Sequence, residues 1–153
     1  MQEASYEALP EDRVRLIEAA VRAMDTAYSP YSGFSVGAAL LTTGGDIITG
    51  SNVENAAYGS TICAERAALL RANAMGHRAF TAIAVIARGR DGPTLTVTAP
   101  CGACRQMLFE ASCVGRQDFE VILASTGREK IIVTTINELL PLPFGPKISA
   151  DGH

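Results

Sequence analysis

Two short cysteine motifs, each at the expected start of a helix, constrain this chain more than any other feature. The first is Cys63-Ala64-Glu65, and the second, which begins 35 residues after Glu65, is Pro100-Cys101-Gly102-Ala103-Cys104. Cys101 and Cys104 are three residues apart, so in a helix their side chains project from one face. A fold that brings the two helix starts together would gather three thiolates and one carboxylate at a single point.

Three thiolates in this arrangement suit a zinc ion, which binds cysteine sulfur in tetrahedral geometry at about 2.3 Å. Both helix N-termini favour anions and would help to keep the thiols ionised. Three protein ligands leave zinc one position for a water molecule, whose pKa then falls to about 7. Glu65, beside that position, is a candidate base. A lone C-x-x-C pair would also fit a redox site or half of a zinc knuckle.

The fourth cysteine, Cys113, does not fit the same site. It follows Cys104 by nine residues, which places it on the opposite side of an ideal helix and about 13 Å further along. We interpret it as a buried apolar residue, the usual role of a free cysteine. His77 and His153 have no neighbours that suggest a ligand role.

Length and composition indicate one globular domain, the net charge indicates a small-molecule partner, and the lack of a signal or membrane segment predicts a cytoplasmic location. Of the 153 residues, 48% are apolar and 19% charged, and the net charge of −3 provides no basic surface for nucleic acid. The acidic N-terminus is not a secretory signal. Residues 81–87 form the longest apolar stretch, far short of the roughly 20 residues that span a bilayer, so we expect no membrane partner.

Hydrophobic periodicity predicts helices alternating with strands. This order indicates an α/β fold with three layers, α/β/α, in which the central layer is a mixed sheet of five strands. We expect residues 1–10 to form a flexible extension, 11–146 a single domain and 147–153 a flexible tail. The predicted helices are 11–28, 63–75 and 101–113, and the predicted strands are 34–41, 47–52, 81–87, 119–124 and 130–135.

The segment from Leu139 to Pro146 is apolar but too rich in proline for a helix or a strand. Either the core of this chain or another subunit must cover it.

Five segments together closely resemble the cytidine deaminase family, and specifically its small homotetrameric type with three cysteine ligands. The resemblance runs from about Tyr28 to Pro146. Residues 59–62, within it, are more polar than is usual in the family. The five segments are Tyr31–Leu40, Asn52–Tyr58, Cys63–Arg66, Pro100–Gln106, and Leu139–Pro141 with Phe144–Pro146.

The resemblance implies a homotetrameric enzyme with one zinc ion per chain. It would convert cytidine and 2′-deoxycytidine to uridine and 2′-deoxyuridine with release of ammonia, in pyrimidine salvage. By the same resemblance, Cys63, Cys101 and Cys104 bind the zinc ion and Glu65 moves the proton. The implied substrate residues are Phe34 against the base, Asn52 and Glu54 on the ribose 3′-hydroxyl, the Ala64 backbone at the base edge, Ala56 and Tyr58 along the pocket, and Phe144 from a neighbouring subunit.

The charge of the metal site raises a further question. Three thiolates and Zn²⁺ sum to −1, which weakens the effect of the metal on water compared with a site of neutral histidines. Arg66 and Arg105 each neighbour a site residue and could donate to a thiolate. We favour Arg66.

Two alternatives remain open at this point. One is a deaminase of the same fold that acts on a modified cytidine or a nucleoside antibiotic. The other is a zinc-stabilised binding module without chemistry, which would need a fourth protein ligand and would have no use for Glu65.

Overall fold

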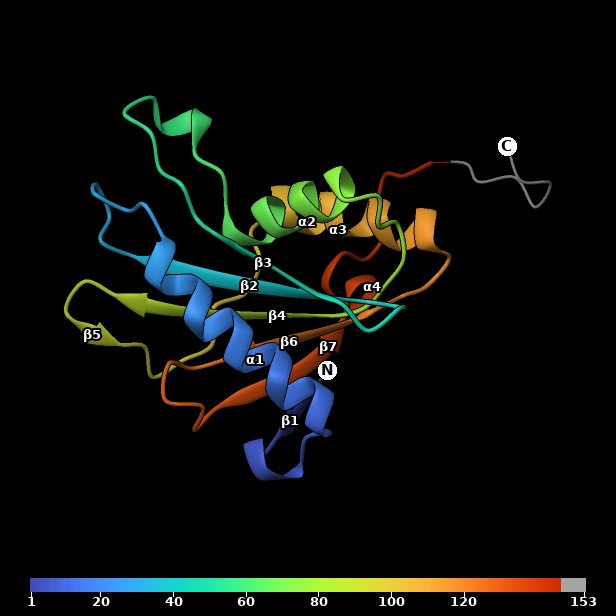
Figure 1. Ribbon diagram of the computed structural model, residues 1–153, viewed down its shortest axis with the longest axis horizontal. Coiled ribbons are helices and arrows are strands. Elements are labelled where there is room, and N and C mark those ends of the chain that lie inside the picture. The colour runs from blue at the N-terminus through green and yellow to red at the C-terminus, as the bar shows by residue number, and fades with distance from the viewer. Residues whose placement is uncertain (147–153) are drawn as a thin grey trace.

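The structure is a computed structural model, and it describes residues 1–146. A mixed sheet runs through its centre in the strand order β1-β7-β6-β4-β2-β3, with β5 paired to β4 outside this order (Figure 1). β4 and β6 are parallel, and the other pairs are antiparallel. The strands are β1 (Gln2–Ala4), β2 (Ser35–Thr42), β3 (Ile47–Ser51), β4 (Phe80–Gly89), β5 (Gly92–Pro93), β6 (Glu120–Ala124) and β7 (Ile131–Thr135).

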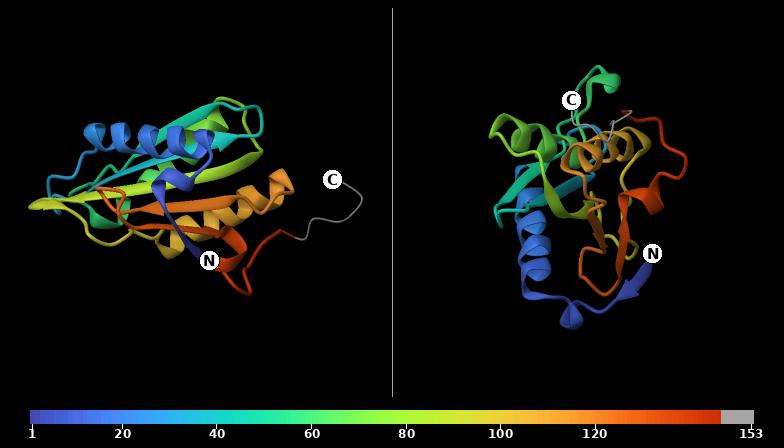
Figure 2. Two further views of the ribbon diagram at one scale, coloured as in Figure 1. Left: turned by 90° about the horizontal axis from the view of Figure 1, so that it is seen from below. Right: turned by 90° about the vertical axis from the view of Figure 1, so that its right-hand side faces the viewer.

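Helices cover both faces of the sheet (Figure 2). One face packs against α1 (Glu11–Ala23), and the other against α2 (Ala64–Ala74), α3 (Gly102–Gly115) and α4 (Ile136–Leu139). The three-layer α/β/α prediction is confirmed, and the short strands β1 and β5 are additional to the five strands predicted. Three 3₁₀ turns complete the chain: η1 (Tyr6–Ala8), η2 (Met24–Thr26) and η3 (Tyr58–Ser60). Within residues 1–146, no helix is long and apolar enough to cross a membrane.

The position of α2 depends on its close packing against β3. A Cβ atom on Gly50 would stand 2.7 Å from the carbonyl oxygen of Ala64, so only glycine lets the first turn of α2 approach this strand. Ala64, Ala68 and Leu108 bury their side chains in the same core, which joins α2 to α3 on one face of the sheet. Both helices that begin at a cysteine are therefore fixed on that face.

The N-terminal ten residues differ from the flexible extension that we expected. Gln2–Ala4 forms β1 and pairs antiparallel with β7, with Gln2 opposite Val133. Tyr6 packs against the core beneath α1, and its hydroxyl donates to Glu18 at 2.7 Å. The physical reason is that β7 would otherwise end the sheet with unpaired backbone groups, and Tyr6 supplies apolar area that holds the segment in place.

The C-terminal apolar segment is only partly covered. Leu139 is buried, whereas Leu142 is 100% exposed and Phe144 is 88% exposed. The chain's own core therefore does not cover the end of this segment. Residues 147–153, predicted as a flexible tail, lie outside the described residues.

Candidate metal centre and substrate pocket

Three cysteines meet where α2 and α3 begin. Cys63 is the N-cap of α2, Cys101 is the N-cap of α3, and Cys104 lies in the first turn of α3. Their sulfur atoms all lie within 4.8 Å of one another, with 3.8 Å between Cys63 and Cys101 and 3.5 Å between Cys101 and Cys104. Tetrahedral zinc with Zn–S bonds near 2.3 Å requires sulfur atoms about 3.8 Å apart. The donor set and its spacing therefore fit one zinc ion.

Electrostatics supports the same assignment. A hydrogen bond with Cys104, followed by those with Arg66 and Cys101, lowers the pKa of Cys63 to about 5, so this group is a thiolate at neutral pH. The Cys63 thiolate and burial in turn raise the pKa of Cys104. Three sulfur atoms this close cannot all be ionised unless a cation offsets their repulsion. A divalent metal ion meets that requirement.

The metal group has three members among residues 1–146, and Cys113 is not one of them. Cys113 lies near the far end of α3, half-buried. The prediction that it cannot join the site is therefore confirmed.

Glu65 lies in the first turn of α2 and is 4% exposed. It lines the same pocket as Cys63 and Cys101. Burial raises the pKa of Glu65, and the negative charge of Cys63 adds to the effect. A buried carboxyl group with a raised pKa can both accept and return a proton near neutral pH.

The two candidate arginines have different contacts. Nη2 of Arg66 donates to the carbonyl oxygen of Thr61 at 2.9 Å and to the sulfur of Cys63 at 3.8 Å. Arg105 instead donates to the carbonyl oxygens of Pro100 and Leu139. Of the two, only Arg66 contacts a sulfur.

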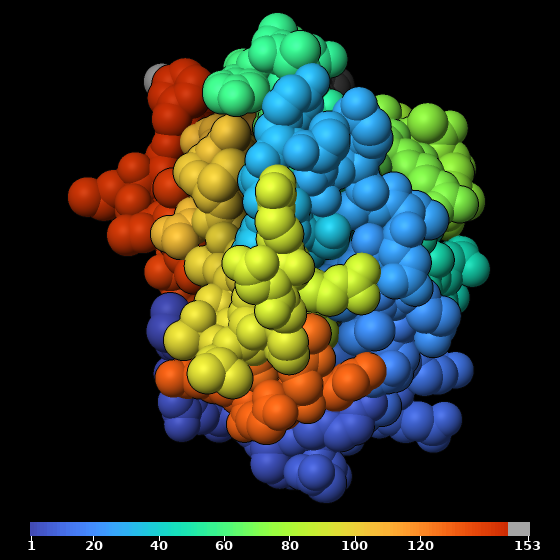
Figure 3. All heavy atoms as spheres, turned by 90° about the vertical axis from the view of Figure 1, so that its left-hand side faces the viewer, coloured from blue at the N-terminus to red at the C-terminus, as the bar shows by residue number. Residues whose placement is uncertain are grey.

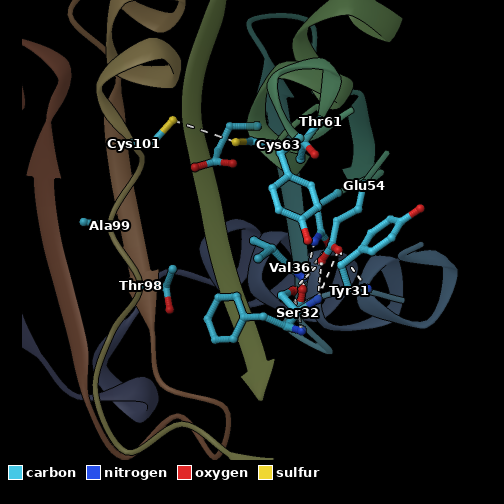
Figure 4. A pocket seen from close by; sticks show the side chains of 13 residues that line it. Tyr31, Ser32, Val36, Glu54, Thr61, Cys63, Thr98, Ala99 and Cys101 are labelled. Atoms are coloured by element: carbon cyan, nitrogen blue, oxygen red, sulfur yellow. Dashed lines mark hydrogen bonds between the residues drawn. The ribbon is translucent and has the colours of Figure 1, made fainter. Parts of the chain in front are cut away.

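The pocket has a volume of about 630 Å³, within the usual range for a small-molecule site. Cys63 and Cys101 mark one end, and Glu54 lies with Tyr31 and Ser32 at the other (Figure 4). Of the predicted site residues, Phe34, Asn52, Glu54, Tyr58, Cys63, Glu65 and Cys101 line it.

The other predicted substrate residues lie outside the pocket walls of this chain. Ala64 is fully buried, and Ala56 is exposed. Phe144 points to solvent, while its carbonyl oxygen accepts a hydrogen bond from Gln106 at 2.7 Å. A single chain therefore does not bring Phe144 to its own pocket.

Sequence reasoning missed six residues that line the pocket. Thr61 lies two residues before Cys63, and the pair Thr98 and Ala99 directly precedes Pro100. This closeness to the two cysteine motifs was the available signal. Tyr31 contacts Tyr58 edge to face, with ring centroids 5.7 Å apart. The six are Tyr31, Ser32, Val36, Thr61, Thr98 and Ala99.

Asn52 and Glu54 both bind the segment that leads into β2. Asn52 accepts from the backbone N–H of Val36 and donates to the carbonyl oxygen of Phe34, both at 2.8 Å. Glu54 accepts from the backbone N–H groups of Tyr31 and Ser32, each at 3.1 Å, and from the Ser32 hydroxyl. The Ser32 hydroxyl, with these backbone groups, lowers the pKa of Glu54. Asn52 retains a second N–H, and both residues retain free lone pairs for a ligand.

Comparison with known proteins gives a consistent result. Residues 10–117 match the family model described as the cytidine and deoxycytidylate deaminase zinc-binding region. A cytidine deaminase of Halalkalibacterium halodurans is 47% identical over 133 residues, which cover 87% of this chain and 94% of that protein.

Solved structures agree with these sequence matches. A cytidine deaminase from Burkholderia pseudomallei is 48% identical, with a TM-score of 0.75 over 85% of this chain and 97% of that one. The cytidine deaminase from Mycobacterium tuberculosis is 36% identical, with a TM-score of 0.70 over 90% of this chain and 100% of that one. With its zinc-binding region, its cysteine group and its fold all matched, this chain belongs to the cytidine and deoxycytidylate deaminase family.

Proposed function

We propose that this protein is a zinc-dependent hydrolase that converts cytidine and 2′-deoxycytidine to uridine and 2′-deoxyuridine, with release of ammonia, in pyrimidine salvage. One observation carries the proposal: three cysteine sulfurs with zinc spacing share a pocket with the buried carboxyl group of Glu65. The relatives named above are cytidine deaminases, which supports the same reaction.

The chemistry divides between the metal and Glu65. When bound by Cys63, Cys101 and Cys104, zinc acts as a Lewis acid that makes water nucleophilic near neutral pH. Glu65 accepts a proton from the attacking water as the water oxygen bonds to C4 of the cytosine ring. It delivers this proton to N3. It then takes the second water proton from the new C4 hydroxyl group and passes it to the amine, which leaves as ammonia while the C4 carbonyl of the uracil ring forms. The buried position of Glu65 favours these transfers, because it brings the pKa of the carboxyl group closer to neutral pH.

Arg66 would support the metal site without touching the substrate. Its guanidinium group places a positive charge beside the Cys63 sulfur. This charge offsets part of the excess negative charge of three thiolates, so that the metal retains its effect on water.

The walls of the pocket favour a nucleoside over a nucleotide. Glu54 and Glu65 line it, and no arginine or lysine of residues 1–146 does. A substrate phosphate would therefore meet two carboxyl groups and no cation from this chain. This charge pattern favours cytidine over deoxycytidylate, the other substrate in the family's name.

We assign substrate contacts from one end of the pocket to the other. Phe34 stacks on the base, and the backbone of Ala64 binds its edge. Asn52 and Glu54 bind the ribose 3′-hydroxyl, so a free base would leave their polar groups unpaired. Tyr58 completes the wall of the pocket. Ala56, which is not part of the wall, is assigned to the substrate by the family resemblance alone.

The exposed C-terminal segment supports assembly of this chain into an oligomer. We propose that the oligomer is a homotetramer and that it works in the cytoplasm, as the family resemblance implies. Leu142 and Phe144 are almost fully exposed, which is unfavourable for large apolar side chains in a monomer. We propose that Phe144 covers the pocket of a neighbouring subunit.

A direct assay tests the function. Zinc-loaded protein is mixed with cytidine, 2′-deoxycytidine, deoxycytidylate and cytosine, and formation of each uracil product is followed with and without a zinc chelator. We expect turnover of the two nucleosides, little of the nucleotide or the base, and loss with the chelator. No turnover of either nucleoside would contradict the proposal.

The binding-module alternative would need a fourth protein ligand, whereas the metal group found among residues 1–146 has three members, and buried Glu65 lines the same pocket. Thr61, from the unusually polar 59–62 segment, lines the pocket. A deaminase of modified cytidines or nucleoside antibiotics therefore remains the second candidate, and the same assay with such substrates separates the two.

A further inference from the structure

A two-residue turn between β4 and β5 reaches the ribose end of the pocket. Arg88 of β4 lies opposite Ser35, where β2 begins, and β4 runs antiparallel to β2. Residues that follow Arg88 therefore lie beside residues that precede Ser35. Gly89 pairs with Gly92, which leaves Arg90 and Asp91 at the tip of the hairpin. Figure 3 shows this hairpin (yellow-green) on the surface beside the segment that leads into β2 (light blue).

Arg90 holds the turn that precedes β2. Its Nη2 donates to the carbonyl oxygen of Tyr31 at 3.0 Å, across 59 positions of sequence. Its side chain also lies directly over Gly33: a Cβ atom on Gly33 would stand 2.7 Å from the Cβ of Arg90 and closer still to its Nε. Gly33 has a φ of +67°, a conformation that glycine adopts readily. Arg90 and Gly33 therefore fit together as a pair.

The same turn also binds Glu54. The backbone N–H groups of Tyr31 and Ser32 and the Ser32 hydroxyl all donate to that carboxylate. The Ser32 hydroxyl also accepts from the backbone N–H of Phe34 at 3.0 Å. The turn thus contacts both Arg90 and Glu54, and Phe34 is its last residue.

From this geometry we propose that Arg90 is a positioning residue for substrate binding, which fixes the Tyr31–Phe34 turn and so presents Glu54 and Phe34 to the nucleoside. Arg90 does not line the pocket, so it acts through the turn and not on the substrate. The inference rests on the proposed function, because the assigned ligand of Glu54 and Phe34 is a nucleoside.

Loss of this contact should weaken substrate binding and leave the chemical step intact. We expect Arg90→Gln to raise KM for cytidine about three- to tenfold, the range expected for one ordinary intramolecular hydrogen bond, because this contact is exposed to solvent. The kcat should stay within about twofold of the wild type. Product uridine should bind more weakly by the same factor in calorimetry. Arg90→Lys keeps the charge, loses the planar fork, and should restore only part of the affinity.

Arg88→Gln is the matched control, because it removes the same charge from the same hairpin. Arg88 is directed to Asp25, at 3.5 Å, and not to the turn. The KM of the Arg88→Gln variant for cytidine should equal that of the wild type.

A double-mutant cycle tests the pair from the other side. Gly33→Asn can keep a positive φ, since asparagine tolerates this region, but its side chain displaces Arg90. The two single variants and the double variant should then show similar KM values, because each removes the same contact.

The outcomes are distinct. A KM for Arg90→Gln equal to that of Arg88→Gln, or effects of Gly33→Asn and Arg90→Gln that add in full, would overturn this inference. A fall in kcat with unchanged KM and uridine affinity would also overturn it. Failure of the wild type to deaminate cytidine would instead defeat the proposed function.

Discussion

Nη2 of Arg66 lies 3.8 Å from the sulfur of Cys63 and 2.9 Å from the carbonyl oxygen of Thr61. Arg66 therefore connects the N-cap of α2 to the loop before it. Because Cys63 is the N-cap, the same contact orders the helix start and places a positive charge at the metal site.

Replacing this arginine should weaken the metal site. We expect Arg66→Gln to lower zinc affinity or turnover about 10- to 100-fold, the usual effect of losing a group that supports a metal ligand. Zinc content after dialysis and kcat measure the two effects. Arg71→Gln is the control, because Arg71 lies on the same helix but donates to Thr49. Unchanged zinc retention and turnover in Arg66→Gln would contradict the role.

Replacement of Glu65 distinguishes the two hypotheses, an enzyme and a zinc-binding module without chemistry. Glu65→Gln keeps the size of the side chain but cannot transfer the proton, so kcat should fall by at least about 10²-fold. Zinc content and the thermal midpoint should remain close to those of the wild type, because the metal group does not include Glu65. Near-normal turnover with zinc bound would exclude Glu65 as the proton carrier.

Asn52 should affect both stability and substrate binding. Asn52→Ala removes the two hydrogen bonds to Phe34 and Val36 and leaves those backbone groups unpaired, so we expect a loss of about 2 kcal/mol in the free energy of unfolding. Urea unfolding measures this loss. The exposed Asn73 is the control position. A stability equal to that of the wild type would show that water replaces the side chain.

The contact between Glu18 and Arg128 should give a pH-dependent contribution to stability. Burial of Glu18 opposes its ionisation, but hydrogen bonds from Tyr6 and Arg128 outweigh burial and lower its pKa. A lowered pKa stabilises the folded state above the unfolded value of about 4.3, and this contribution disappears as pH falls through the folded value.

Arg128→Gln should therefore cost about 1 kcal/mol at pH 7, since the pair is only partly shielded from solvent, and much less at pH 3. Urea unfolding at the two pH values checks this. Arg15→Gln, an exposed charge change on α1, controls for net charge. A cost that does not change with pH would contradict the ionic origin.

Phe144 offers a test of subunit sharing. We expect Phe144→Ala and Glu65→Gln each to be poorly active alone. Mixed and reassembled, they should recover activity, because an intact Glu65 then receives an intact Phe144 from its neighbour. Light scattering establishes the assembly state. No recovery in verified mixed assemblies would contradict the shared site.

The sequence predicted the main elements well, because their signals are local. The two cysteine motifs coincide with the N-caps of α2 and α3, and the apolar run 81–87 lies within β4. Local chemistry was also enough to choose Cys63, Cys101 and Cys104 and to exclude Cys113.

Contacts between distant segments could not be predicted in this way. Arg90 reaches Tyr31 only because β4 pairs with β2, and no local pattern marks that register. The same holds for β1, whose three residues are too few to show a strand periodicity and which forms only because β7 offers an open edge. Asn52 was predicted to contact ribose, and its two bonds to the backbone of β2 and the residue before it were missed for the same reason.

The pairing of β1 with β7 also has a consequence for solubility. An unpaired strand edge is a template on which a second molecule can add, and the exposed row of N–H and C=O groups on β7 would offer one. β1 occupies that row with a strand only three residues long, and Glu3 beside Lys130 places charge along the new edge. At this edge of the sheet, the first residues of the chain therefore disfavour edge-to-edge aggregation.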